Sequence, residues 1–490
     1  MLLAGSRGGA PGLAFTPPAG PGMRVVMAKS SFVCQACGAV APKWQGRCDA
    51  CGAWNTLIEE AAAPRGPGPA AKSGAGRRLE FVGLKGTSDP PARMLTGIAE
   101  LDRVLGGGLV AASAVLVGGD PGIGKSTILL QAAARIAAAG HRALYISGEE
   151  AVEQVRLRAA RLGLSESPMA LASATNLRDI IASLEREPEA ALVVIDSIQT
   201  VWLDSLDSAP GTVAQVRACA AELVRSAKAR GFAVILVGHV TKEGTLAGPR
   251  VLEHMVDATL YFEGDRGHQF RILRATKNRF GATDEIGVFE MTDAGLVEVA
   301  NPSALFLAER RGNVSGSAVF AGIEGTRPVL VEVQALLSPS SGGSPRRQVV
   351  GWDSGRLSML LAVLESRCGM SLGQNDVYLN VAGGLRIQEP AADLAVAAAL
   401  ASAATDRPTD PDRVYFGEIG LSGEIRQVSQ PDQRLREAQK LGFAQATLPK
   451  RTARPGRTNA APEGLALDEI GHLADLVAKF AVASVKKRNT

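Results

Sequence analysis

Nine consecutive residues have the types and the spacing of a phosphate-binding loop: Gly119-Asp120-Pro121-Gly122-Ile123-Gly124-Lys125-Ser126-Thr127. The glycines let the backbone curl, so that successive N–H groups point toward phosphate oxygens. Lys125 can reach the β- and γ-phosphates of ATP, and Ser126 can offer its hydroxyl to Mg²⁺. A glycine-rich turn without a ligand is the alternative. The loop predicts a site for ATP and Mg²⁺ if the elements around it fit.

The segments on either side of the loop have the required character. Residues 114–117 form a short apolar run that indicates a buried strand, and residues 128–139 are rich in Ala and Leu, as in a helix. A phosphate-binding loop lies between such a strand and such a helix. The positive N-terminal end of the helix would add to the attraction for phosphate. The context therefore favours nucleotide binding over a bare turn.

Three further apolar runs end in polar residues. They cover residues 143–147, 192–195 and 233–237, and they are followed by Gly148-Glu149-Glu150, Asp196-Ser197 and Gly238-His239. Nearly continuous apolar strands separated by helices indicate a parallel sheet covered on both faces. Ligands bind at the carboxyl ends of strands in such sheets, so we expect the three polar endings to lie near the phosphate loop.

These endings suggest individual roles. Asp196 fits the acidic residue that holds the Mg²⁺ shell, and Glu149 or its neighbour Glu150 fits the base that orients an attacking water. His239 fits a sensor of the γ-phosphate. A single Asp at a strand end is weak support, and a lone His is more often structural. The coincidence of three endings behind a phosphate loop carries the prediction.

Two pairs of cysteines have the spacing of a zinc ribbon: Cys34-x-x-Cys37 and Cys48-x-x-Cys51, each followed by a glycine. Four thiolates at this spacing can converge on one tetrahedral Zn²⁺ ion. Six cysteines in 490 residues do not suggest a disulfide scaffold, although two disulfides or unrelated thiols are the alternative. We predict a structural zinc site, because no open ligand position is evident.

The composition is that of a soluble globular protein of about two to four domains, with 46% hydrophobic and 21% charged residues. A net charge of +4 does not by itself indicate a nucleic-acid partner. Aromatic residues make up 4%, which argues against base stacking as the main binding device. No uncharged apolar run reaches the length of a membrane span, so we expect no membrane partner and a cytoplasmic location.

One motif identifies a family. The stretch Lys277-Asn278-Arg279-Phe280-Gly281 resembles the signature of the RadA (Sms) family of bacterial DNA-repair proteins among the RecA-like ATPases. Three supporting stretches are Thr241-Lys242-Glu243-Gly244, residues 247–254 and Gly351-Trp352-Asp353-Ser354. The resemblance implies a RecA-like core that assembles as a ring of six subunits. It also implies ATP-driven movement on single-stranded and branched DNA, serving branch migration alongside a strand-exchange recombinase.

The motif itself is compatible with a role between subunits. Phe270 and Ile272 suggest a strand of a hairpin, which places Lys277 and Arg279 near its turn. From there the two cations can meet the ATP of a neighbour and stabilise the developing phosphate charge, as an arginine finger does. A solvated basic turn and a contact with DNA are the alternatives.

Two loops are candidates for contact with DNA: residues 203–212 and 242–250. Both follow strands at the ATP end of the predicted sheet and are rich in small residues. Lys242 and Arg250 can pair with phosphates, in a contact that depends on salt and not on sequence. The alternative is that both loops simply cross the surface.

The C-terminal third resembles the proteolytic domain of the Lon protease, which uses a Ser–Lys dyad. Ala391 stands where the nucleophilic Ser belongs, and the Lys position falls near Asp432. Without nucleophile and base the dyad cannot perform acyl transfer, so we interpret the domain as an inactive scaffold for ring assembly. Basic residues add local positive charge that is compatible with DNA contact: Arg346, Arg347, Arg356 and Arg386.

The sequence thus predicts an α/β chain in five parts. We expect a tail (1–30, with Met27 as an alternative start), a zinc ribbon (31–60), a linker (61–80), a RecA-like ATPase domain (81–300) and an α+β Lon-like domain (301–490). The predicted function is that of a DNA-dependent ATPase and DNA translocase in recombinational repair. The alternatives are a nucleotide-switched adaptor that loads a recombinase without moving, and an ATP-dependent protease.

Overall fold

The structure is a computed structural model that describes residues 31–34, 39–50, 52–60, 92–239, 251–264, 270–283, 285–307, 310, 313–340, 344–451 and 461–480. Several predictions fall outside these residues. They concern the tail with Met27, the linker, the ligands Cys37 and Cys51, and the candidate DNA loop with Lys242 and Arg250.

The N-terminal ribbon is a small antiparallel sheet in the order β2-β1-β3. Its strands are β1 (Ser31–Cys34), β2 (Val40–Ala41) and β3 (Leu57–Glu60). Cys34, Cys48 and Leu57 form its buried cluster. Within the described residues of the ribbon, these three side chains are the buried apolar cluster, and a core this small does not stabilise a fold alone. Ribbons of this size therefore depend on a metal.

A nine-stranded sheet forms the centre of the chain, in the order β14-β13-β12-β11-β6-β10-β9-β7-β8. The six strands from β11 to β8 in that order run parallel, and β12, β13 and β14 extend the sheet antiparallel. The bounds are β6 (Ala114–Gly119), β7 (Arg142–Ser147), β8 (Ala170–Ser173), β9 (Ala190–Asp196), β10 (Ala233–Val237), β11 (Ala258–Glu263), β12 (Phe270–Asn278), β13 (Ile286–Thr292) and β14 (Gly295–Glu298).

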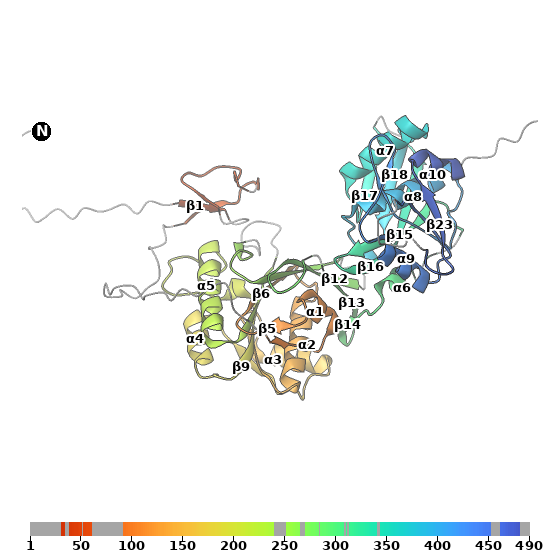
Figure 1. The fold of residues 1–490 in the computed structure, drawn as a ribbon. Coiled ribbons are helices and arrows are strands. Elements are labelled where there is room, and N and C mark those ends of the chain that lie inside the picture. The colour runs from red at the N-terminus through yellow and green to blue at the C-terminus, as the bar shows by residue number, and fades with distance from the viewer. Residues whose placement is uncertain are drawn as a thin grey trace, which may run out of the picture.

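Helices cover both faces of this sheet (Figure 1). They are α1 (Ala99–Val104), α2 (Lys125–Ala138), α3 (Val152–Arg161), α4 (Leu177–Leu184) and α5 (Val213–Arg230), with a 3-10 turn at Ile198–Thr200 and a strand pair β4 (Arg93–Met94) and β5 (Leu109–Val110). Alternate residues of one strand enter different cores: Val115 and Val117 pack with α2, whereas Ala114 and Leu116 pack with α4 and α5. The prediction of a parallel sheet buried on both faces is confirmed.

The C-terminal domain is built on a seven-stranded mixed sheet in the order β17-β18-β16-β15-β19-β22-β23. Its strands are β15 (Ser317–Glu324), β16 (Arg327–Pro339), β17 (Arg347–Val350), β18 (Asn375–Val381), β19 (Arg413–Tyr415), β22 (Gln445–Pro449) and β23 (Ala466–Ile470), with the short pair β20 (Glu418–Ile419) and β21 (Ile425–Arg426). Its helices are α6 (Pro302–Leu307), α7 (Ser354–Cys368), α8 (Asp393–Thr405), α9 (Pro431–Lys440) and α10 (Leu473–Phe480), with 3-10 turns at Ala382–Gly384 and Pro390–Ala392.

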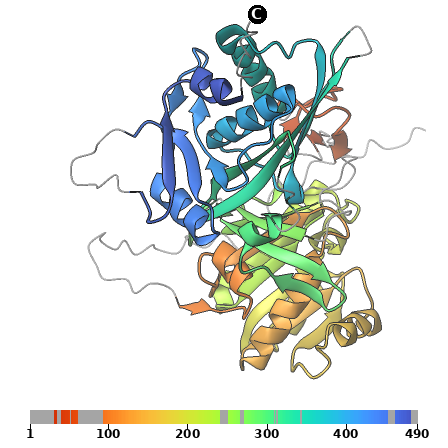
Figure 2. The same ribbon diagram turned by 90° about the vertical axis from the view of Figure 1, so that its right-hand side faces the viewer.

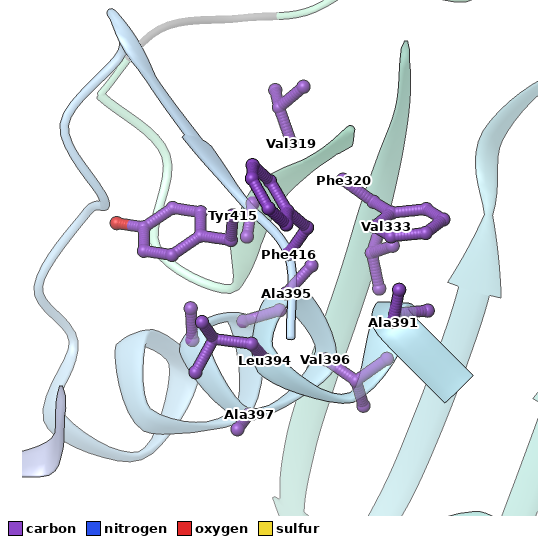
Figure 3. Close-up of a cluster of buried hydrophobic side chains, with 14 of the residues drawn as sticks. Val319, Phe320, Val333, Ala391, Leu394, Ala395, Val396, Ala397, Tyr415 and Phe416 are labelled. Atoms are coloured by element: carbon purple, nitrogen blue, oxygen red, sulfur yellow. The ribbon is translucent and has the colours of Figure 1, made fainter. Parts of the chain in front are cut away.

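Helix α8 is the centre of this domain. Every residue from Asp393 to Ser402 is buried, and the helix packs on β15 and β16 (Figures 2 and 3). A helix that is apolar all round belongs in the middle of a core and not at a surface. The Ala-rich sequence of α8 therefore positions Ala391, just before it, inside the domain.

The hairpin of β12 and β13 connects the two large domains. Ile272 and Ile286 of the hairpin belong to the buried cluster of the C-terminal domain. Two ion pairs accompany this packing: Arg274 lies 2.7 Å from Glu324, and Arg327 lies 2.6 Å from Glu100. The same hairpin carries the family motif at the end of β12 and in the turn that follows.

Candidate nucleotide-binding site

The phosphate loop connects β6 to α2, and its backbone requires glycine. Gly119 has a φ of 145° and Gly124, the N-cap of α2, has a φ of 117°. A Cβ on Gly119 would lie 2.9 Å from the Cβ of Phe262, and one on Gly124 would lie 2.9 Å from Cε of Met291. Both positions therefore require glycine, because the backbone has a positive φ and because neighbouring side chains leave no room for a Cβ atom.

Lys125 begins α2 and folds back over the loop. Its ammonium donates to the carbonyl oxygens of Gly119 (2.8 Å) and Asp120 (2.9 Å). Burial lowers the pKa of Lys125 to about 8, although the carboxylates of Asp196 and Glu149 oppose this shift. A cation that is desolvated in this way gains strongly from any anion that arrives beside it. The lysine is thus poised to exchange two carbonyls for phosphate oxygens.

The structure brings Glu149 and His239 together at the ends of β7 and β10. One oxygen of Glu149 accepts hydrogen bonds from His239 Nε2 (2.9 Å) and from the Ser197 hydroxyl (2.6 Å). The bond from His239 and, more weakly, that from Ser197 lower the pKa of Glu149 to about 2, against the effect of burial. Glu149 is therefore a carboxylate at neutral pH, and it is held at a fixed place between two strand ends.

Glu149 and Glu150, the two candidates for the base, contact different groups in the structure. Glu150 turns toward α3 and forms an ion pair with Arg158, whereas Glu149 faces the charge of Lys125. Of the two residues, Glu149 is therefore the one on the side of the phosphate-loop lysine, and its role as the base stays a prediction. Ser197 is a participant that the sequence reading did not include, although it directly follows Asp196.

Asp196 lies at the end of β9 with 6% of its surface exposed. One carboxylate oxygen accepts a hydrogen bond from the hydroxyl of Tyr145. The other oxygen, Oδ1, is buried and has no partner among the described residues. A buried carboxylate oxygen without a donor is unfavourable unless a cation or its water fills the gap. The donor set of Asp196 and the hydroxyl of Ser126 therefore fits Mg²⁺, which prefers oxygen ligands.

Lys277 and Arg279 are held within their own chain. The ammonium of Lys277 donates to the carbonyl oxygens of Glu253 (2.6 Å) and Val256 (2.8 Å). The guanidinium of Arg279 lies 3.3 Å from a carboxylate oxygen of Asp257, and 59% of its side chain is exposed. Action on the ATP of a neighbour stays a prediction for both residues. The exposure of Arg279 is compatible with it, whereas Lys277 would have to leave two carbonyls.

The other residues of the motif shape the turn. A Cβ on Gly281 would lie 2.7 Å from Cα of Gly106, so the two backbones touch. The Asn278 amide donates to the carbonyl of Val104 (3.3 Å), and Arg93 donates to the carbonyl of Phe280 (2.6 Å). These contacts hold the β12–β13 turn against the residues that follow α1. They therefore fix the position from which the exposed side chain of Arg279 projects.

Of the two candidate DNA loops, residues 203–212 are described. The buried amide of Gln215 donates to three carbonyls of this loop, those of Leu203, Leu206 and Ser208, at 2.8 to 3.2 Å. The loop carries Asp204 and Asp207 and has neither Lys nor Arg. Carboxylates repel phosphates, so this loop is a poor partner for a DNA backbone.

Two of the four predicted zinc ligands, Cys34 and Cys48, lie within the described part of the ribbon. Cys34 and Cys48 are buried in one cluster, with 0% and 3% of their surface exposed. The backbone N–H of Gly52 donates to the carbonyl of Cys48 at 2.8 Å, which closes the second knuckle. Two buried thiols in one cluster are compatible with half of a four-cysteine site. Their partners Cys37 and Cys51 lie outside the described residues.

Replacing Cys34 with Ser should release the metal. Because a structural zinc site needs all four thiolates, we expect the zinc content to fall from about one ion per chain to near zero. Elemental analysis of the purified protein measures this. Cys368→Ser, which alters a thiol in the C-terminal domain, is the control and should retain zinc. Full zinc occupancy in the Cys34→Ser variant would contradict the assignment.

The C-terminal domain has no dyad at the predicted position. Ala391 is 1% exposed and has no hydroxyl, and Asp432 lies in the first turn of α9. Arg434, two residues further, is fully buried and bonds to Glu389 through a 3.0 Å contact. Glu389, one member of this ion pair, lies two residues before Ala391 in the sequence. Neither predicted dyad position carries the Ser or the Lys that the Lon-like resemblance requires.

The basic residues of this domain differ in what they contact. Arg356 donates two bonds, of 2.5 and 2.6 Å, to the buried carboxylate of Asp393. Arg347 donates to the carbonyls of Arg346 and Asn375. Arg386 is exposed. Of the four arginines expected to add positive charge, Arg356 is therefore neutralised by a carboxylate on α8.

Three models of known protein families match parts of the chain. Residues 85–245 match the AAA domain, residues 32–59 match the rubredoxin metal binding domain, and residues 356–452 match the subunit ChlI of Mg-chelatase. Among the described residues, no helix has the length and apolar character of a membrane span.

Curated relatives match along most of the chain. A DNA repair protein RadA of Brucella abortus is 58% identical, covering 94% of this chain and 100% of the relative. Proteins of the same name from Bacillus subtilis and Rickettsia felis are 51% and 54% identical, covering 86% and 85% of this chain and 92% of each relative. The resemblance drawn from the motif at Lys277 is confirmed.

Proposed function

Because the chain belongs to the family of the bacterial DNA repair protein RadA, we propose that it is a DNA-dependent ATPase and DNA translocase of recombinational repair. It works as a ring, of six subunits in our proposal, on single-stranded and branched DNA. Its task is the branch migration of recombination intermediates, alongside a strand-exchange recombinase. The AAA domain match supports the ATPase part of this proposal.

The observation that carries the proposal is the arrangement around Glu149. A carboxylate base, held by His239 and Ser197, lies at the strand ends beside the buried ammonium of Lys125. Nucleotide binding alone needs the loop and its lysine. A base placed between a γ-phosphate sensor and the metal-binding Asp196 is needed only for hydrolysis.

The chemistry follows from these positions. The loop amides and Lys125 hold the phosphates, after the lysine has left the carbonyls of Gly119 and Asp120. Bound Mg²⁺ would neutralise part of the phosphate charge, with Ser126 and Asp196 as its protein ligands. Glu149 orients the attacking water, and Arg279 of a neighbouring subunit stabilises the charge that develops on the transferred phosphoryl group.

His239 connects the chemistry to DNA. It contacts Glu149 at the end of β10, and the chain continues directly into the candidate DNA loop with Lys242 and Arg250. A contact of that loop with DNA would act on the histidine, and so on the position of the base. In our proposal the C-terminal domain takes no part in proteolysis and supports the ring.

The proposal is tested by ATP turnover with and without single-stranded DNA, combined with strand displacement on forked DNA. We expect DNA to raise turnover at least a few-fold, and displacement to require hydrolysable ATP. Turnover without displacement would favour the adaptor that loads a recombinase. Turnover that does not change when DNA is added would contradict the proposed DNA-dependent ATPase.

A further inference from the structure

Tyr145 lies beside the nucleotide site, and the mechanism above gives it no role. It belongs to β7, which pairs in parallel with β9, and its side chain is 1% exposed. Tyr145 and Ser147 occupy alternate positions of β7 and so share one face of the sheet. This is the face that α2 covers, since Tyr145 and the α2 residue Ile128 belong to one buried cluster.

The hydroxyl of Tyr145 reaches across the sheet to Asp196. It donates to Oδ2 of the carboxylate, while Oδ1 remains without a partner among the described residues. A tyrosine hydroxyl carries its proton at neutral pH, so Tyr145 acts as a donor to this one oxygen of the carboxylate.

A hydrogen bond to one oxygen of a carboxylate fixes the orientation of the whole group. The torsion of the Asp side chain is otherwise broad, and the two oxygens can exchange places. The bond from Tyr145 occupies Oδ2, so Oδ1 is the oxygen that can serve the metal. Partners behind metal ligands orient those ligands, and their loss typically costs 10- to 100-fold in metal affinity.

We propose that Tyr145 is a positioning residue for Mg²⁺, acting through Asp196. This inference rests on the proposed ATPase function, because it assigns Asp196 to the Mg²⁺ shell. Tyr145 touches neither nucleotide nor metal in this proposal. Its hydroxyl holds the carboxylate in the orientation that the Mg²⁺–nucleotide complex needs, before the complex arrives.

The test is the Mg²⁺ dependence of nucleotide binding in Tyr145→Phe, which removes only the hydroxyl. The probe is a fluorescent, non-hydrolysable ATP analogue, titrated with Mg²⁺ from an EDTA baseline. We expect the half-saturating Mg²⁺ concentration to rise about tenfold, with unchanged binding in EDTA. The matched control is Tyr415→Phe, which removes the hydroxyl of another buried tyrosine, in the C-terminal domain (Figure 3). It should leave both values unchanged.

A double variant separates positioning from a general loss of structure. If Tyr145 acts through Asp196, then Tyr145→Phe should shift the Mg²⁺ requirement little when it is added to Asp196→Asn. If Tyr145→Phe alone fails to fold, the test compares Asp196→Asn with the double variant. The Asn substitution removes the buried charge that the Tyr145 hydroxyl would otherwise have to stabilise. An Mg²⁺ requirement that stays within twofold of wild type in folded Tyr145→Phe, or an additive shift in the double variant, would overturn the inference. Wild-type protein that binds no nucleotide would instead contradict the proposed function.

Discussion

Replacing Lys125 with Ala should abolish ATP hydrolysis. The residue is the one cation that the structure places on the phosphate loop within the described residues, and its ammonium already lies within 2.9 Å of the loop carbonyls. Loss of a single neutral donor to transition-state charge costs about 10²- to 10³-fold in rate, and loss of a full charge costs at least as much. Steady-state turnover with and without single-stranded DNA measures the effect.

The same variant should fold normally. The pKa of Lys125 is lowered from 10.5 to about 8 in the folded protein, so its protonated form is held less well there than in the unfolded chain. The wild type therefore gains stability relative to Lys125→Ala as the pH rises from about 8 to 10.5. Urea unfolding across this range checks the sign. Lys440→Ala, an exposed lysine on α9, is the control and should change neither turnover nor stability.

Hydrolysis by Lys125→Ala at more than a tenth of the wild-type rate would contradict the assignment of the loop. Loss of hydrolysis together with loss of folding would leave the chemistry undecided for this variant, so the unfolding measurement is made first. Nucleotide binding by the folded variant then distinguishes a binding defect from a chemical one.

The phosphate loop and the strand endings were predictable from sequence because their signals are local. A buried strand, a glycine pattern and a helix follow one another within residues 114–139, and the three other strands show their own apolar runs. Topology then brings their carboxyl ends to one edge, whatever the connections contain. The contact of Glu149 with His239 spans 90 positions, yet it follows from this rule.

The other contacts of the site join side chains from different helices and strands. A local sequence pattern does not predict which of these side chains meet. Tyr145 reads as one more apolar strand residue, although the parallel register sets it beside β9, close to Asp196. Arg356 reads as a surface cation, although the fold gives it the buried Asp393. Lys277 reads as a residue of an open turn, although its ammonium binds the carbonyls that precede Asp257.

Arg279→Ala should suppress hydrolysis by about 10³-fold or more, the usual contribution of an arginine finger. The fold should survive, because Asp257, the buried partner of Arg279, keeps Lys228 at 3.7 Å and the backbone N–H of Ala114 at 3.0 Å. Thermal unfolding checks this point. Lys228→Ala is the matched control, since it removes the other cation near Asp257 and should retain turnover.

Mixing two inactive variants tests whether Arg279 acts across a subunit boundary. Arg279→Ala keeps the base Glu149, and Glu149→Gln keeps the finger. In a mixed ring, about one interface in four combines an intact Glu149 from one subunit with an intact Arg279 from the next, if subunits assort at random. We therefore expect turnover to reappear in the mixture at up to about a quarter of the wild-type rate. If Arg279 serves the site of its own chain or contacts only DNA, no interface is repaired, and the mixture should stay as inactive as its parts.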